Sequence, residues 1–152
     1  MQTYPTGYAQ SHRMAEHIFR DILPRRGMAV REEQIALCHE ILDTLYNKEI
    51  SLCEAGVGIG KTLAYLVACV LWQMNRPDRL KLPVVISTSS VVLQDAIIND
   101  YLPNLSAILL EEGIIQAPLT AVIRKGKERF VCDARLAERA SLVHPKRTRE
   151  KG

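Results

Sequence analysis

The 152-residue sequence lacks the patterns that would assign it to several common classes. Its four cysteines lie far apart without a Cys-x-x-Cys pair, and its histidines show no metal-ligand spacing with them, which argues against a disulfide framework or a zinc site. No repeat or low-complexity segment occurs. The longest apolar stretch, 63–72, is too short to span a bilayer, and the polar first ten residues do not resemble a signal peptide. We therefore expect a cytoplasmic protein without a membrane partner.

The composition is that of a globular protein, but the charge is unevenly distributed. Hydrophobic residues make up 47% and charged residues 24%, and the length suits one domain with a real core. Residues 1–123 carry 10 basic and 13 acidic side chains, whereas residues 124–152 carry 10 basic and 4 acidic ones. A basic end on a nearly neutral domain suggests a polyanionic partner, although a solvated helix with a frayed end would have the same composition.

The most informative stretch is 50–62, an apolar run followed by a glycine-rich loop. The loop has the pattern Ala-x-x-Gly-x-Gly-Lys-Thr, and its residues are Ala55, Gly56, Val57, Gly58, Ile59, Gly60, Lys61 and Thr62. Alternating glycines let backbone N–H groups approach a phosphate, and a helix that begins near Lys61 adds its positive dipole end. Lys61 and Thr62 are the candidate catalytic residues, since a lysine here can reach the phosphates and the hydroxyl can hold Mg²⁺. The pattern predicts a P-loop; the alternative is a glycine-rich turn before an ordinary helix.

Periodicity predicts alternating helices and strands. Ser11 is expected to cap the first helix, Pro24 and Gly27 to end it, and Pro103 to break the chain after the fourth; the predicted helices cover 11–23, 31–47, 62–75, 91–101, 105–112 and 133–143. Continuous apolar runs at 50–54, 83–87 and 119–123 predict strands of a parallel sheet. The fold class that follows is α/β, a parallel sheet flanked by helices.

Residues 107–112 could form a helix or a strand, because four apolar residues followed by two acids are also typical of a Walker B strand. The usual leading Asp is absent, however, and the apolar spacing fits one face of a helix that Gly113 closes. We therefore predict a helix here.

Four blocks together resemble one family. They are Arg-x-x-Gln at 31–34, the P-loop and its helix at 54–66, Ser-Thr-Ser-Ser followed by Leu-Gln at 86–94, and Lys-Gly-Lys-Glu-Arg-Phe-Val-Cys at 125–132. In this order they resemble the N-terminal part of DinG/XPD-type helicases, the iron–sulfur branch of superfamily 2. The resemblance implies a partial RecA-like P-loop domain at 29–124, after a helical extension at 1–28 and before the start of an iron–sulfur segment with a basic tail at 125–152.

The resemblance also implies roles for individual residues. Arg31 and Gln34 would belong to the motif that recognises the adenine of ATP, and the P-loop would hold the phosphates and Mg²⁺. Single-stranded DNA would be contacted by two groups of residues, namely Thr88 and Gln94, and Lys125, Lys127 and Arg129. Cys132 would be the first of four cysteine ligands of an iron–sulfur cluster.

The family needs parts that this sequence does not contain. They are an Asp-Glu-x-His segment, three cysteines after Cys132, and a second RecA-like domain with a catalytic arginine; Cys38, Cys53 and Cys69 precede the segment and cannot replace those ligands. We therefore expect an ATP-binding helicase fragment that is inactive alone and does not assemble the cluster by itself. It would be a truncated product, or one piece of a split helicase whose partner is the remainder.

Two other classes remain open. A small P-loop kinase would suit the length, but it gives no role to the Arg-x-x-Gln and Leu-Gln blocks. A non-enzymatic module would bind nucleic acid through residues 124–152 and retain the P-loop without using it.

Overall fold

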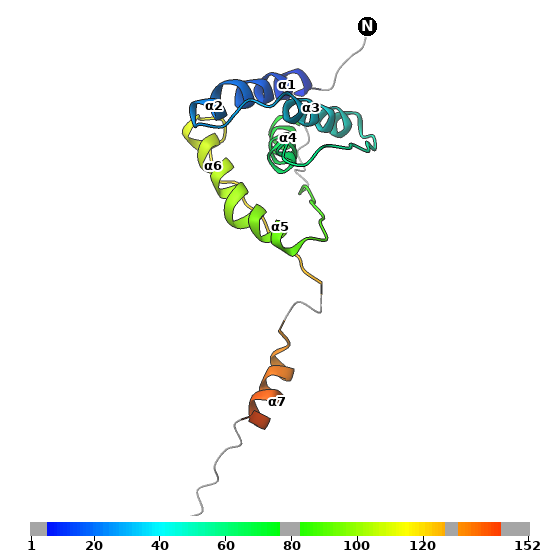
Figure 1. The fold of residues 1–152 in the computed structure, drawn as a ribbon, viewed down its shortest axis with the longest axis vertical. Helices are drawn as coiled ribbons and strands as arrows, with labels where there is room; N and C mark the ends of the chain where they lie inside the picture. The colour runs from blue at the N-terminus through cyan, green and yellow to red at the C-terminus, as the bar shows by residue number, and fades with distance from the viewer. Residues whose placement is uncertain (1–5, 77–82, 127–130, 144–152) are drawn as a thin grey trace, which may run out of the picture. The chain divides into compact units, whose positions relative to one another are not determined.

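The structure is a computed structural model that describes residues 6–76, 83–126 and 131–143. It divides into two units, Met1–Leu119 and Thr120–Gly152, and each is described by itself. The first unit contains α1 (Tyr8–His17), the π-helical η1 (Ile18–Ile22), α2 (Leu23–Arg25), α3 (Glu32–Asn47), α4 (Lys61–Asn75), α5 (Val91–Ala96), the π-helical η2 (Ile97–Tyr101) and α6 (Leu102–Glu111). The second contains α7 (Asp133–Val143). Figure 1 shows α1 to α4 gathered together, with α6 running beside α2.

The core of the first unit lies between helices. Each helix contributes apolar residues at three- and four-residue spacing, which form one stripe. Helix α4 is apolar nearly all round, and it packs against both α1 and α3. The buried side chains of the first unit include Ile18, Ile22, Ile35, Leu42, Val67, Leu71, Leu105 and Leu109.

The predicted cap at Ser11 is wrong. Helix α1 starts three residues earlier, after Gly7 with φ 88°, and Ser11 is fully buried inside it. The Ser11 hydroxyl lies 2.8 Å from the Tyr46 hydroxyl and accepts a hydrogen bond from the Asn75 amide at 3.0 Å. It therefore joins α1 to α3 and α4, a tertiary role that a local capping rule cannot detect.

The predicted break at Pro103 is also wrong. Helix runs without interruption from Val91 through η2 to Glu111, and in the same way α1 continues through η1 to Arg25. In both places a π segment precedes a Leu-Pro pair, so that the residue four before the proline, Arg20 or Asn99, lies in the wider turn. Proline has no N–H to donate, and its ring crowds the carbonyl of the residue four positions before it. The wider π turn accommodates both the missing hydrogen bond and the ring. Gly27, with φ 82°, then ends the first helical run.

The predicted parallel sheet is absent from the part of the chain that the structure describes. Residues 49–56, 83–88 and 118–126 have neither helix nor strand and form no ladder, and the described architecture is helical. Several of their apolar side chains are exposed, among them Ile50, Leu52, Val85 and Val122. The α/β fold class is therefore wrong for this chain, because extended segments become a sheet only when their backbone groups pair with one another.

The other helix predictions are confirmed within a few residues. The spans 31–47, 62–75 and 133–143 correspond to α3, α4 and α7, and 105–112 lies almost entirely in α6, with Gly113 at φ 66° after it. In the described ranges, no helix has the length and apolar composition to cross a membrane.

Candidate nucleotide-binding site

The glycine loop leads directly into α4. Gly58 and Gly60 have φ of 86° and 87°, values that non-glycine residues rarely adopt, so both positions need glycine for backbone reasons. Gly60 has a second constraint, since a Cβ there would overlap the side-chain amide nitrogen of Gln34. Gly60 has no side chain with which to cap α4, and the first N–H groups of a helix have no partner within the helix itself.

The first turn of α3 lies against this loop. Gln34 is 7% exposed and donates its Nε2 hydrogen bond to the carbonyl of Gly60 at 2.8 Å. Arg31, the residue that precedes α3, donates through Nη1 to the carbonyl of Gly58. The structure thus brings together two sequence blocks 27 residues apart, and both contacts are with carbonyls of glycines in a left-handed conformation.

Lys61 and Thr62 occupy the start of α4. The Lys61 ammonium donates to the carbonyls of Ala55 at 2.9 Å and Gly56 at 2.7 Å, so its side chain bends back across the loop. Thr62 is half-buried, and one turn along the helix lies Tyr65. Burial raises the pKa of the Tyr65 phenol, and the nearby Thr62 side chain opposes that rise.

The remaining loop positions differ in exposure. Val57 is fully exposed at the tip, whereas Ala55 and Ile59 are half-buried. A glycine loop, the start of a helix and one ammonium group make up a donor set suited to phosphate oxygens. The residues present therefore fit the phosphates of a nucleotide, and Thr62 supplies one hydroxyl oxygen of the kind that Mg²⁺ accepts as a ligand.

Two supporting residues were missed by sequence reasoning. Glu40 on α3 accepts a hydrogen bond at 2.8 Å from Ser51, which lies four residues before Ala55, and so ties the approach to the loop to the same helix that carries Gln34. Tyr65, the second, stands beside Thr62. Helical spacing of three residues from Thr62 would have pointed to Tyr65, but no local signal pairs Glu40 with Ser51.

The residues predicted to contact DNA from the third block form a local turn. The Ser90 hydroxyl caps α5 by accepting from the N–H of Leu93 at 3.2 Å, and the Ser90 N–H donates to the Thr88 hydroxyl at 3.1 Å. Gln94 donates to the Thr88 carbonyl at 3.3 Å. Its Oε1 is buried, and among the described residues it has no hydrogen-bond partner.

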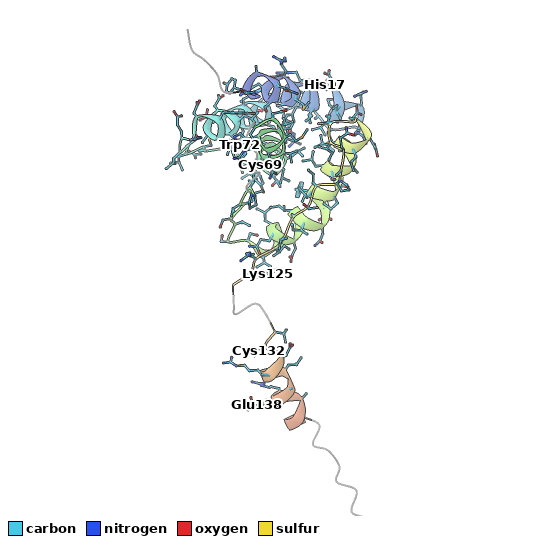
Figure 2. The ribbon with its side chains drawn as sticks, turned by 180° about the vertical axis from the view of Figure 1, so that it is seen from behind. His17, Cys69, Trp72, Lys125, Cys132 and Glu138 are labelled. Atoms are coloured by element: carbon cyan, nitrogen blue, oxygen red, sulfur yellow. The ribbon has the colours of Figure 1, made fainter. Side chains whose placement is uncertain are left out.

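The fourth block lies in the second unit. Figure 2 labels Lys125 before α7 and Cys132 next to its start, and Cys132 is exposed. Lys127 and Arg129 lie outside the described residues. No set of three or more His, Cys, Asp or Glu side chains within the described part of the chain is placed to hold a metal ion. The described residues therefore do not fit an iron–sulfur cluster.

Comparison with known proteins finds relatives over most of the chain. It is 33% identical over 117 residues to the 3'-5' exonuclease DinG of Bacillus subtilis, which is 77% of this chain and 11% of that protein. It is 35% identical over 63 residues to the probable ATP-dependent helicase YpvA of the same organism, and 29% identical over 92 residues to DinG of Staphylococcus aureus. No family model and no solved structure matches the chain.

These matches assign the chain to a family. It belongs to the DinG-like helicases, and it spans about a tenth of the length of the curated relatives it matches.

Proposed function

We propose that the first unit binds ATP with Mg²⁺ as part of the nucleotide-binding region of a DinG-like helicase. The observation that carries this proposal is the meeting of two distant blocks, with Arg31 and Gln34 bonded to the carbonyls of Gly58 and Gly60. A glycine-rich turn without a ligand role would not require a buried amide from another helix to fix its last glycine. A small P-loop kinase gives these two side chains no task, and the family assignment favours the helicase class.

In this proposal each residue has a distinct task. Lys61 exchanges its contacts with the loop carbonyls for phosphate oxygens, and Thr62 offers its hydroxyl to Mg²⁺. Gln34 keeps one amide hydrogen and its carbonyl oxygen, the donor and acceptor that the adenine edge requires. Bound Mg²⁺ would neutralise charge on the phosphates.

Equilibrium binding of a fluorescent ATP analogue with Mg²⁺ tests this proposal. We expect Lys61→Ala to weaken binding at least tenfold, because it removes the ammonium group that would contact the phosphates. Arg13→Ala, which deletes an exposed cation from α1, is the matched control and should bind as the wild type does. Gln34→Ala should reduce the preference for ATP over GTP. Equal affinity of Lys61→Ala and the wild type would contradict the proposal.

We further propose that the 152 residues alone neither hydrolyse ATP efficiently nor unwind DNA. Catalysis of phosphoryl transfer depends on positioning and charge stabilisation, and the sequence contains neither the Asp-Glu-x-His acids nor a second domain with an arginine. The remainder of a split helicase would be the partner that supplies them. Detection of DNA-stimulated ATPase in the purified chain, lost in Lys61→Ala, would refute this part.

A role for the second unit in binding single-stranded DNA is a separate proposal. Its support is the excess of basic side chains in 124–152. Thr88 and Gln94 of the third block lie in the first unit, and a DNA contact there is proposed separately. Deleting residues 124–152 should lower DNA affinity, and added salt should weaken binding steeply in the full chain only. Unchanged affinity after the deletion would show that these residues are merely solvated.

A further inference from the structure

A ladder of ionisable side chains joins α1 to α3, away from the glycine loop. Tyr8, His12, Glu16 and Arg20 follow one another at four-residue spacing and so share one face, and opposite them lie Glu32, His39 and Asp43 of α3. At one end Arg20 donates from its two terminal guanidinium nitrogens, Nη1 and Nη2, to the Glu32 carboxylate at 2.7 and 2.8 Å. Its Nε donates to Glu16. At the other end the Tyr8 hydroxyl donates to Asp43 at 2.5 Å.

Two histidines occupy the middle of the ladder. The rings of His12 and His39 are nearly parallel, with centroids 4.7 Å apart and an interplanar angle of 5°, and their Nδ1 atoms are separated by 2.6 Å. Both side chains are half-buried. At this separation the two Nδ1 atoms form a hydrogen bond that contains one proton, since two Nδ1–H groups would face each other.

The neighbours of the rings determine where the protons sit. Glu16 accepts at 2.8 Å from Nε2 of His39, so this nitrogen carries a hydrogen, and in neutral His39 the Nδ1 is then bare. His12 must therefore donate its Nδ1–H. In neutral His12 the Nε2 is bare, 3.1 Å from Asp43 Oδ1, and it has no hydrogen-bond partner in the described residues.

Successive protonation then has opposite effects on the ladder. A first proton on Nε2 of His12 creates a donor toward Asp43 and leaves the contact between the rings intact. A second proton has no site except Nδ1 of His39, where it would oppose the donor of His12 and place two positive rings in direct contact. The pair can hold one extra proton while α1 is docked, but it cannot hold two.

We propose that the His12–His39 pair is an acid-sensitive clasp that releases α1 from α3 when both rings are protonated. The charged or titratable groups that the structure places around the pair are Tyr8, Glu16 and Arg20 from the α1–η1 run and Glu32, Asp43 and Tyr46 from α3. From α4, the atoms bonded next to it are the neutral Leu71 carbonyl and Asn75 amide, which bind Ser11. The proposal is independent of nucleotide binding.

The direction of the pH effect follows from linkage. Burial, followed by the proximity of His39, lowers the pKa of His12 in the folded chain, while Asp43 acts in the opposite sense. The unfolded chain takes up protons at both histidines near pH 6.5 and so binds more protons than the folded chain below that pH. The contribution of the pair to the free energy of unfolding is therefore complete above about pH 6.5 and is lost as the pH falls below it.

Urea unfolding of the full chain between pH 7.5 and 5.5 tests the clasp, since most carboxylates stay ionised in this range. One excluded proton raises the unfolding constant up to about tenfold per pH unit. The wild type should show this rise, and His39→Gln should remove most of it. His17→Gln is the matched control, since His17 is exposed on the same helix, 2.7 Å from Asp21, and it should retain the full response. The same pH response in His39→Gln and the wild type would overturn the proposal.

Hydrogen exchange with ring NMR supplies a readout that needs no variant. After correction for intrinsic exchange rates, the amides of α1 should lose protection between pH 7.5 and 5.5 before those of α4 do. The ring signals of His12 and His39 report whether each ring is protonated at a given pH. Two histidine rings that are both protonated while α1 remains protected would also overturn the clasp.

Discussion

Two regions of the first unit have similar side chains and opposite environments. Leu42 of α3 is 0% exposed, and apolar side chains of α1, α4 and α6 surround the same core. In the segment 49–56, which has neither helix nor strand, Ile50 and Leu52 are 100% and 101% exposed, although these side chains are just as apolar as Leu42. Apolar content alone therefore does not decide which segment becomes buried.

The difference arises from where backbone hydrogen bonds are made. Each helix satisfies its own N–H and C=O groups, so it can bury an apolar stripe against a single neighbour. An extended segment satisfies these groups only against another segment or water. In the described part of the chain the segments 49–56, 83–88 and 118–126 form no strand ladder, and apolar side chains such as Ile50, Leu52 and Val85 remain in contact with solvent.

The test with the largest expected effect truncates a leucine to alanine in each of the two regions. Leu42→Ala should lower the free energy of unfolding by about 2–5 kcal/mol, because it leaves a cavity in the core. Leu52→Ala removes the same atoms from an exposed position and should change it by less than about 0.5 kcal/mol. Urea unfolding at pH 7.5 measures both. Similar losses in the two variants would show that Leu52 is buried in solution and would remove the contrast between the regions.

A second test examines the point where the two regions meet. At position 58 or 60 the native backbone would force an alanine into the left-handed region, which costs about 1–2 kcal/mol. Gly60→Ala should cost more than Gly58→Ala, since its Cβ would displace the Gln34 amide, whereas Gly58 has open space around it. A lost hydrogen bond accounts for roughly 0.5–1.5 kcal/mol of that excess.

The background variant Gln34→Ala shows whether this contact causes the excess. In that background the costs of Gly58→Ala and Gly60→Ala in urea unfolding should become equal. A persistent excess at Gly60 would mean that its backbone geometry, rather than Gln34, makes the position sensitive.

The smallest effect is expected from the ion pairs that join α2 to α6. Arg26 Nη2 lies 2.6 Å from Glu111 and 3.6 Å from Glu112, on the surface. Arg26→Gln should lower the thermal midpoint slightly at low salt and have no effect near 1 M salt, because exposed pairs are screened. Arg13→Gln, an exposed cation on α1, should leave the midpoint unchanged at either salt concentration. A loss that high salt does not reduce would show that Arg26 acts through packing.

Sequence reasoning predicted the helices better than their arrangement. The periodic apolar stripes of α3, α4 and α7 identified these helices almost to the residue. Residue type alone predicted an unusual backbone at Gly56, Gly58 and Gly60; Gly58 and Gly60 adopt positive φ, and Gly56 does not. Helix continuity across Pro103 was not predictable, because it depends on a π turn that forms before the proline.

What the sequence determined by itself was local. Periodicity specified the helices, glycine and proline marked where the backbone needs unusual geometry, and the four blocks identified the family. Only the tertiary structure decided that Ser11 is a buried link and not a cap, that Gln34 bonds Gly60, and that the apolar runs remain unpaired. The physical reason is the range of the interactions. A helix is closed by bonds four residues apart, whereas these contacts depend on which distant segment is present to supply the partner.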